Sequence, residues 1–80
     1  MLNDWEEKNN KLCKTFQFKS YLKNLSFVNA VAWEANRMNH HPELIVTFSQ
    51  CQVSLQTHDA GNTVTDKDYS LAKKIDDLLC

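Results

Sequence analysis

His40, His41 and His58 are the side chains of this chain that could most readily transfer protons near neutral pH. Histidine often serves as an acid or a base there, and two imidazoles can divide the work, one accepting a proton while the other donates one. His40 and His41 stand directly before Pro42, and Asp59 follows His58. The pattern favours acid–base chemistry on a bound substrate, provided that the fold returns position 58 to positions 40 and 41.

Two segments between the histidines predict that return. Every second residue is apolar in segments 44–48 and 51–55, which is typical of paired strands. A two-residue turn at positions 49–50 aligns three apolar pairs on one face of a hairpin: Phe48 with Cys51, Val46 with Val53, and Leu44 with Leu55. Continued outward, this register places His41 opposite His58. We therefore expect two or three imidazoles to share one cleft.

Helical spacing predicts two helices around this hairpin. One is expected over residues 20–39, with Ser20 as its N-cap, and one over residues 65–79, with Thr65 as its N-cap. Asp68 falls in the first turn of the second helix, where a carboxylate favours the positive end of the helix dipole. The apolar stripe of the first helix is expected to consist of Tyr21, Leu25, Val28, Ala32 and Ala35, widened by Leu22, Ala30, Val31 and Met38.

Two further strands precede the first helix. A short edge strand is expected over residues 5–8, and period-two apolar residues predict a half-buried strand over residues 12–18. The resulting order, β-β-α-β-β-α, predicts an α+β fold: a four-stranded antiparallel sheet with helices packed on one face. Residues 1–80 are expected to form a single-domain, two-layer sandwich.

Composition excludes several classes of function. Nine basic and ten acidic residues give a formal net charge of −1, so the strongly basic surface of a nucleic-acid-binding protein is absent. No apolar run approaches the roughly 18 residues of a membrane span. The three cysteines have no CxxC spacing, and we expect a thiol-reduced, cytoplasmic protein in which Cys51 is a buried strand residue.

Spacing alone leaves other uses of the histidines open. Imidazoles near a helix end often cap carbonyl groups or lie in solvent. Metal binding is the chemical rival, but His-His-Pro matches no usual ligand spacing, and the missing ligands would have to come from Asp59, Asp68 or a cysteine. The predicted pairing places no serine or cysteine beside a histidine, which disfavours a nucleophilic enzyme. We therefore expect no metal site.

The small size of the chain favours self-association. A domain of 80 residues without disulfides is marginally stable alone, and oligomerisation adds buried area. We expect a homodimer or homotetramer, formed through helix or edge-strand contacts.

In combination, the motifs resemble the pterin-4a-carbinolamine dehydratase family. The resemblance runs from about Trp5 to Leu79. It rests on Phe16-Gln17-Phe18-Lys19, Asn39-His40-His41-Pro42-Glu43, Phe48, Gln56-Thr57-His58-Asp59, and Asp68 with Leu71-Ala72. Each piece is weak alone, whereas the set with these spacings is specific.

The resemblance implies a hydro-lyase that converts 4a-hydroxytetrahydropterin to quinonoid dihydropterin, in the recycling of tetrahydrobiopterin, without a metal or an organic cofactor. The implied catalytic residues are the three histidines, with His40 as the base, His58 as the acid and His41 holding the pterin. Those two roles could be exchanged, because the sequence does not orient the ring. The implied substrate-binding residues are Asn39, Pro42, Gln56, Thr57 and Asp59, supported by Asn36 and Asp68.

One residue departs from the family pattern. The position four residues before the first histidine is Asn36, where the family favours a charged group that would orient a histidine. The resemblance also leaves a second class of function open, because an animal member of the family serves as a dimerisation partner of a transcription factor. The alternative is therefore a non-catalytic pterin-binding or protein-dimerisation partner, although such a protein has no need of all three histidines.

Overall fold

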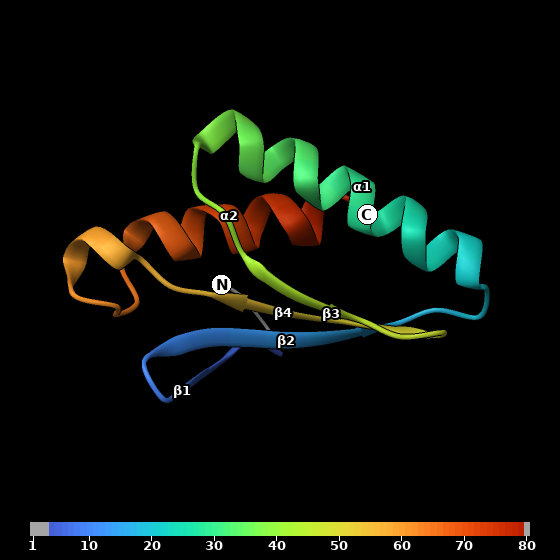
Figure 1. Ribbon diagram of the computed structural model, residues 1–80, viewed down its shortest axis with the longest axis horizontal. Helices are drawn as coiled ribbons and strands as arrows, with labels where there is room; N and C mark the ends of the chain where they lie inside the picture. The colour runs from blue at the N-terminus through green and yellow to red at the C-terminus, as the bar shows by residue number, and fades with distance from the viewer. Residues whose placement is uncertain (1–3, 80) are drawn as a thin grey trace.

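The computed structural model describes residues 4–79 and confirms the predicted arrangement of two helices on one face of a four-stranded antiparallel sheet (Figure 1). The elements follow one another as β1 (Glu6–Lys8), β2 (Lys11–Gln17), α1 (Tyr21–Met38), β3 (Glu43–Val46), β4 (Gln50–Leu55), a short 3-10 turn η1 (His58–Ala60) and α2 (Asp66–Asp77). The strand order across the sheet is β1-β2-β4-β3.

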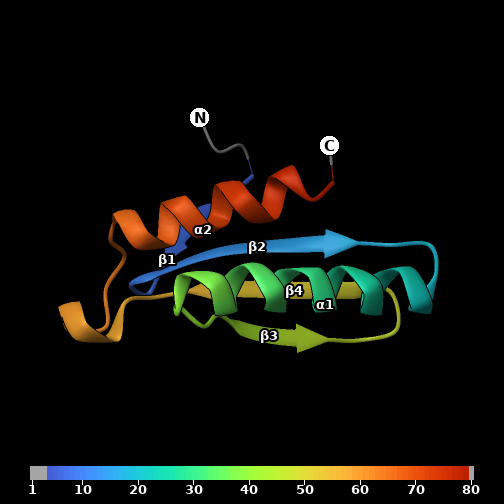
Figure 2. The same cartoon turned by 90° about the horizontal axis from the view of Figure 1, so that it is seen from above.

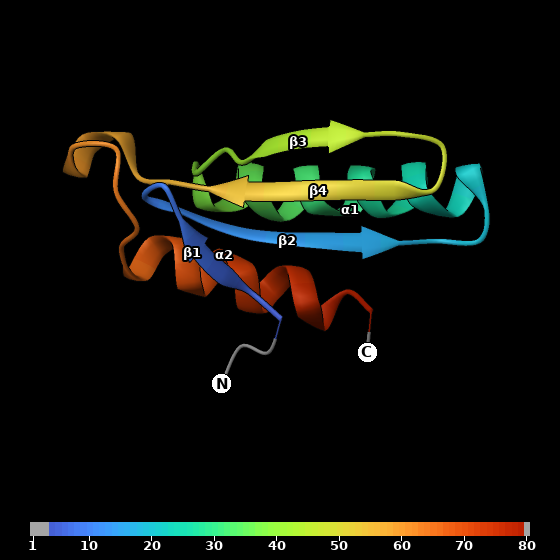
Figure 3. The same ribbon diagram turned by 90° about the horizontal axis from the view of Figure 1, so that it is seen from below.

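The two helices divide the covered face between them. Seen from above, α1 lies along β3 and β4, and α2 lies along β2 (Figure 2). Seen from below, the opposite face of the sheet has no helix over it (Figure 3). The core between the layers consists of apolar side chains from both helices and the central strands: Leu12, Phe16, Phe27, Val31, Ala35, Cys51, Val53, Leu55, Leu71, Ala72 and Ile75. Neither helix combines the length and apolar character that crossing a bilayer requires, within the residues described.

The ends of α1 agree with the prediction, but its buried face does not. Ser20 caps the helix by accepting a hydrogen bond from the backbone N–H of Lys23 at 3.2 Å, and Asn39 ends it in the left-handed region with φ 50°. Of the predicted stripe, Tyr21 and Ala32 are exposed. The buried residues are Asn24, Phe27, Val31 and Ala35, so the face toward the sheet is rotated around the helix.

Asn24 explains this rotation. A polar residue was not expected on the buried face, yet its Nδ2 donates to the backbone carbonyl of Thr47 at 2.8 Å and to that of Gln50 at 2.9 Å. Thr47 lies in the connection between β3 and β4, and Gln50 is the first residue of β4, so the amide fastens α1 to the end of the hairpin. Burying an amide nitrogen with two such acceptors lowers the stability of the fold far less than burying an unpaired one.

We expect Asn24→Ala to lower the free energy of unfolding by about 1–3 kcal/mol, because it removes a buried side chain that donates to the Thr47 and Gln50 carbonyls. Urea denaturation followed by circular dichroism measures the change. Asn29→Ala is the matched control, since Asn29 is an exposed asparagine on the same helix. Equal effects from both variants would contradict the role assigned to Asn24.

The predicted register of the hairpin is wrong by two residues. Val46 pairs with Cys51 and Leu44 with Val53, and Thr47 N–H donates to the Gln50 carbonyl at 2.9 Å. The turn therefore centres on Phe48 and Ser49, one position before the two-residue turn predicted at positions 49–50, where Ser-Gln is a poor type I′ sequence. Because side chains in a strand repeat every two residues, the slip leaves the same face of β4 buried.

Cys51 is fully buried in β4, as expected, and burial raises the pKa of its thiol above the usual range. In α2, the half-buried Asp76 carboxylate accepts hydrogen bonds from Trp5 Nε1 at 3.0 Å and Lys14 Nζ at 2.9 Å. These contacts tie the N-terminal strands to the last helix.

Candidate active site

Three chain segments meet at one end of the sandwich. The C-terminal end of α1 leads to the adjacent histidines, β4 runs back toward them into η1, and α2 begins beside both (Figures 1 and 2). A depression of about 200 Å³ lies at this meeting point. The lining side chains are mostly polar: Asn39, His40, His41, Gln56, Thr57, His58, Asp59 and Lys67.

All three histidines line this depression, although the predicted pairing of His41 with His58 is wrong. The β3–β4 ladder ends at Glu43 opposite Ser54, and its continuation places His41 opposite Gln56. His58 reaches the site because β4 continues into η1. The prediction that folding gathers the imidazoles in one cleft thus agrees with the structure, whereas the pairing from which it was derived does not.

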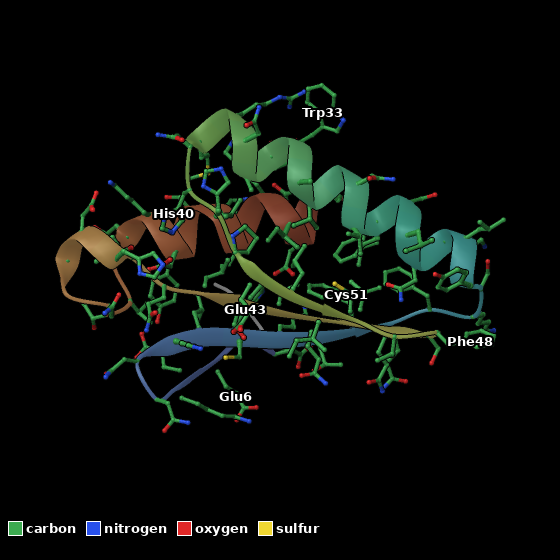
Figure 4. The ribbon with its side chains drawn as sticks, viewed as in Figure 1. Glu6, Trp33, His40, Glu43, Phe48 and Cys51 are labelled. Atoms are coloured by element: carbon green, nitrogen blue, oxygen red, sulfur yellow. The ribbon has the colours of Figure 1, made fainter. Side chains whose placement is uncertain are left out.

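His40 is held by a buried carboxylate. Its Nε2 lies 2.6 Å from Asp68 Oδ1, the His40 side chain is 11% exposed and the Asp68 side chain is 0% exposed. Because an ionised carboxylate only accepts hydrogen bonds, Nε2 carries a proton. Nδ1 of a neutral His40 is then the nitrogen that can accept another. In Figure 4, His40 lies between the end of α1 and the start of α2.

Asp68 also completes the cap of α2. Its Oδ2 accepts from the Thr57 hydroxyl at 2.8 Å and from the Thr65 backbone N–H at 2.8 Å, the second bond being half of a capping box. The two threonine hydroxyls lie 2.7 Å apart, and since Thr57 donates its proton to Asp68, Thr65 donates to Thr57. Position in the sequence predicted Asp68 as a helix-dipole charge and the resemblance implied a supporting site role; the structure adds the capping box and the contact with His40.

His58 is exposed and is oriented by a neutral group. Its Nδ1 lies 2.7 Å from Asn62 Oδ1, in a loop where Gly61 and Asn62 both adopt left-handed backbone angles of φ 85° and 59°. An amide oxygen accepts only, so Nδ1 carries a proton and Nε2 remains free for other partners. His41 is also exposed, and its side chain makes no hydrogen bond within residues 4–79.

Two predicted site residues lie elsewhere. Asn36 and Pro42 line a neighbouring groove of about 500 Å³ between α1 and β3, which also contains Trp33 and Leu44. This groove shares only His41 with the depression described above. Asn36 therefore lines the same groove as the second histidine.

Sequence reasoning missed Lys67 and Asn62. Lys67 was not singled out in the sequence, yet it lines the depression from the first turn of α2. Its place two residues after the predicted N-cap was the available signal, because a helix that begins beside a site presents its first turn to that site. Asn62 lay in a predicted loop, and nothing in the sequence marked it as the partner of His58.

The arrangement is suited to proton transfer. Two imidazoles are each fixed through one ring nitrogen and retain the other for a ligand, which is the arrangement that a paired acid and base require. One is backed by a carboxylate, which stabilises the imidazolium that forms when it accepts a proton. Nowhere in residues 4–79 do three histidine, cysteine or acidic side chains gather in a way that could hold a metal ion.

Sequence comparison relates the chain to named proteins. A family model described as pterin 4 alpha carbinolamine dehydratase matches residues 1–78. Relatives provisionally named pterin-4-alpha-carbinolamine dehydratase include those of Nitrosomonas eutropha, Sulfolobus acidocaldarius and Legionella pneumophila. They are 40%, 42% and 46% identical to this chain, over 75, 77 and 77 residues respectively.

The shared region fills almost all of this chain and a variable part of each relative. The matches cover 94%, 96% and 94% of the present chain, in the same order. They cover 66%, 84% and 67% of the relatives. The chain thus spans just under two thirds of the length of the Nitrosomonas relative.

Two solved structures share the fold. A crystal structure of a transcriptional coactivator/pterin dehydratase from Brucella melitensis superposes with a TM-score of 0.88 at 28% identity, covering 94% of this chain and 81% of that one. A pterin dehydratase-like protein, identified as a RuBisCO assembly factor in the alpha-carboxysome, gives a TM-score of 0.80 at 23% identity, covering 95% and 89%. At that identity the second likeness concerns the fold alone.

Proposed function

Because the chain belongs to the pterin-4a-carbinolamine dehydratase family, we propose that it dehydrates 4a-hydroxytetrahydropterin to quinonoid dihydropterin by histidine acid–base catalysis. The observation that carries the proposal is the set of three histidines around one depression, with His40 held against the buried Asp68. The reaction needs one proton removed and one supplied, and two of these imidazoles each retain a nitrogen for that work.

In the proposed mechanism, His40 is the base and His58 is the acid. Nδ1 of His40 takes the proton from N5 of the pterin while Nε2 stays bonded to Asp68, which stabilises the imidazolium. Protonated His58 gives the proton on Nε2 to the C4a hydroxyl, and its Nδ1–H stays bonded to Asn62. The N5–H and C4a–O bonds break, a C4a–N5 double bond forms, and one water leaves. Proton exchange with solvent resets both histidines.

The remaining site residues are proposed to hold the substrate. His41 is exposed and has no partner among the described residues, so its ring is available to the pterin. Asn39, Gln56 and Asp59 line the same depression and offer amide and carboxylate groups to the polar edge of the ring. Thr57 acts through its hydrogen bond to Asp68.

Two proposed supporting residues act from outside the depression. Pro42 fixes the backbone directly after His41, because its ring restricts both its own φ angle and the residue before it. Asn36 stands in the groove that borders His41. The pathway proposed is tetrahydrobiopterin recycling in the cytoplasm.

A stopped-flow dehydration assay tests the proposal. Freshly formed 4a-hydroxytetrahydropterin is mixed with chelator-treated protein or with buffer, and quinonoid dihydropterin is followed by its absorbance. We expect the protein to accelerate the reaction in proportion to its concentration. A folded protein that binds a stable pterin without accelerating dehydration would contradict the proposal and favour the alternative, a non-catalytic binding or dimerisation partner.

We also propose that the protein is a homodimer or homotetramer. Strand β3 is an edge of the sheet, and Ile45, Val46 and Phe48 at that edge are 50%, 37% and 72% exposed. On α1, Leu22 and Trp33 are 73% and 65% exposed, and Figure 4 shows Trp33 pointing away from the sheet. Exposed apolar groups beside an unpaired strand edge favour association.

Light scattering coupled to size exclusion should therefore give a mass that is a multiple of the 9.3 kDa chain. Phe48→Lys is expected to shift the distribution toward the monomer if the strand edge is the interface, and Trp33→Lys if the outer face of α1 is. A monomer at micromolar concentration would overturn the expectation.

A further inference from the structure

Asn62 contacts His58 from outside the candidate active site. Its Oδ1 lies 2.7 Å from His58 Nδ1, yet Asn62 lines neither the depression among the histidines nor a second one of about 200 Å³ that His58 also borders. No other side chain bonds to the His58 ring within residues 4–79. Asn62 can therefore influence a ligand held in the site only through this ring.

The loop that carries Asn62 is fixed by bonds that do not involve its amide. The Asn62 backbone carbonyl accepts a hydrogen bond from Gln56 Nε2 at 3.0 Å, and the Thr57 N–H donates to the Thr63 carbonyl at 2.9 Å. Figure 1 shows this connection between β4 and α2 as a compact turn at one end of the molecule. Because these bonds use backbone groups of the loop, they remain when the side chain at position 62 is changed.

The backbone angle at position 62 restricts which residues can stand there. Asn62 has φ 59°, in the left-handed region that glycine, asparagine and aspartate adopt most readily. Of these three residues, asparagine offers a neutral oxygen acceptor, aspartate offers a charged one and glycine offers none. Two substitutions therefore keep the backbone conformation, one of which removes the acceptor while the other gives it a charge.

A neutral oxygen suits the partner of a proton donor. Protonated His58 carries a proton on each ring nitrogen, so only an acceptor can face its Nδ1. After Nε2 has given its proton away, Nδ1–H still donates to the same amide oxygen, and the bond persists through the reaction. A carboxylate at this position would stabilise the protonated ring and make His58 a weaker acid.

His40 has the opposite kind of partner, because its Nε2 lies 2.6 Å from the Asp68 carboxylate, which favours the acceptance of a proton. We infer that Asn62 is a positioning residue: its neutral amide fixes the His58 ring with Nε2 toward the substrate and keeps it a ready proton donor. The amide and the carboxylate thereby assign the acid and base roles. This inference rests on the proposed dehydratase function and adds what distinguishes the two histidines.

The charged groups around His58 do not make this distinction by themselves. Those that share a depression with it come from β2, β3, η1, α2 and the segment after α1: Lys11, Glu43, Asp59, Lys67, His40 and His41. Two carboxylates and two ammonium groups have formal charges that cancel, and none of the six bonds to the His58 ring. Direct contact with the ring belongs to Asn62.

The test replaces Asn62 by glycine and by aspartate and measures kcat for pterin dehydration against pH. Asn62→Gly should lower kcat by about 3- to 10-fold, as expected for one lost hydrogen bond, with KM unchanged. Asn62→Asp should lower kcat by about threefold and move the alkaline limb of the profile up by about one pH unit. The direction follows because an acid acts only while protonated, and the added carboxylate keeps His58 protonated to higher pH.

Nitrogen-edited NMR of the His58 ring gives a readout that does not depend on activity. At a pH where the ring is neutral, the wild type should show the Nδ1–H tautomer alone, and Asn62→Gly should show a mixture of both tautomers. Asn9→Gly and Asn9→Asp are the matched controls, because Asn9 is an exposed asparagine with φ 52° in the turn between β1 and β2. Both controls should retain the wild-type profile and tautomer.

The outcomes separate the inference from the proposal beneath it. Wild-type kinetics in both Asn62 variants, or a shift of the acidic limb in Asn62→Asp, overturns the inference while dehydration stands. An Nε2–H tautomer in the wild type also overturns it, because the amide would then donate to the ring. Absence of dehydration in a wild type that shows the Nδ1–H tautomer overturns the dehydratase proposal, and the assignment of roles with it.

Discussion

Asp68→Asn is expected to lower the rate of pterin dehydration on the order of 100- to 10,000-fold while leaving the protein folded, by analogy with the aspartate of serine-protease triads. The amide oxygen can still accept from the Thr57 hydroxyl and the Thr65 backbone N–H, so the helix cap survives. The amide nitrogen then faces His40 Nε2 and donates to it. His40 must in turn carry its proton on Nδ1, the nitrogen proposed to accept the proton from the substrate.

Nitrogen-edited NMR of the histidine rings gives the readout that a purely structural role would not change. Wild-type His40 should show the Nε2–H tautomer, and Asp68→Asn should show the Nδ1–H tautomer. Asp66→Asn is the matched control, since Asp66 is an exposed aspartate in the same helical turn. Unchanged kcat in Asp68→Asn, or a loss shared equally by Asp66→Asn, would contradict the role assigned to the buried carboxylate.

Periodicity was sufficient to predict the architecture because each element carries its own signal. Apolar residues recur every three or four positions in the helix over 20–39 and every second position in the strands around it. Ser20 and Thr65 mark the helix starts, because their side chains accept backbone hydrogen bonds. Two errors arose where tertiary contacts outweigh local pattern. The buried face of α1 includes Asn24, which a search for apolar spacing could not identify because asparagine is polar.

The second error, in the hairpin register, has the same origin. Pairing apolar residues gave a consistent alignment for a two-residue turn, but an alignment two residues away buries the same face of β4. The observed turn is stabilised by Asn24 from another element, which the hairpin sequence does not contain. The local sequence therefore predicts which side chains of each strand face the core, but not which residues of the two strands pair.

The candidate site was only partly visible in the sequence, for a related reason. Adjacent histidines and a third after a predicted strand indicated acid–base chemistry, and the spacing brought them to one end of the fold. The groups that orient them carry no local signal for that role: the pattern predicted Asp68 as a helix-dipole charge, with a supporting role implied by the resemblance alone, and it did not single out Asn62. A side chain that both caps a helix and bonds to a histidine has the same sequence signature as a simple cap.

The histidine variants should separate catalysis from stability, because the two imidazoles differ in burial. His58→Ala is expected to lower kcat on the order of 100- to 10,000-fold through loss of the general acid. Its free energy of unfolding should change by less than about 0.5 kcal/mol, since His58 is exposed and its one described partner, Asn62, lies in a surface loop.

His40→Ala is expected to lose a comparable part of the rate but also to destabilise the fold by about 1–3 kcal/mol, because Asp68 remains buried with one oxygen unpaired. His41→Ala should raise KM more than it lowers kcat, as befits a residue that holds the ring. Stopped-flow kinetics and urea denaturation on the three variants measure both quantities, with the wild type as reference.

The double variant His40→Ala/His58→Ala decides whether the two imidazoles act in one step. If the base and the acid serve the same transition state, removing the second should cost much less than removing the first, because the concerted path is already lost. Additive losses would instead indicate two separate steps. Wild-type-like turnover in both single variants would remove the histidines from the chemistry, whatever the family relationship.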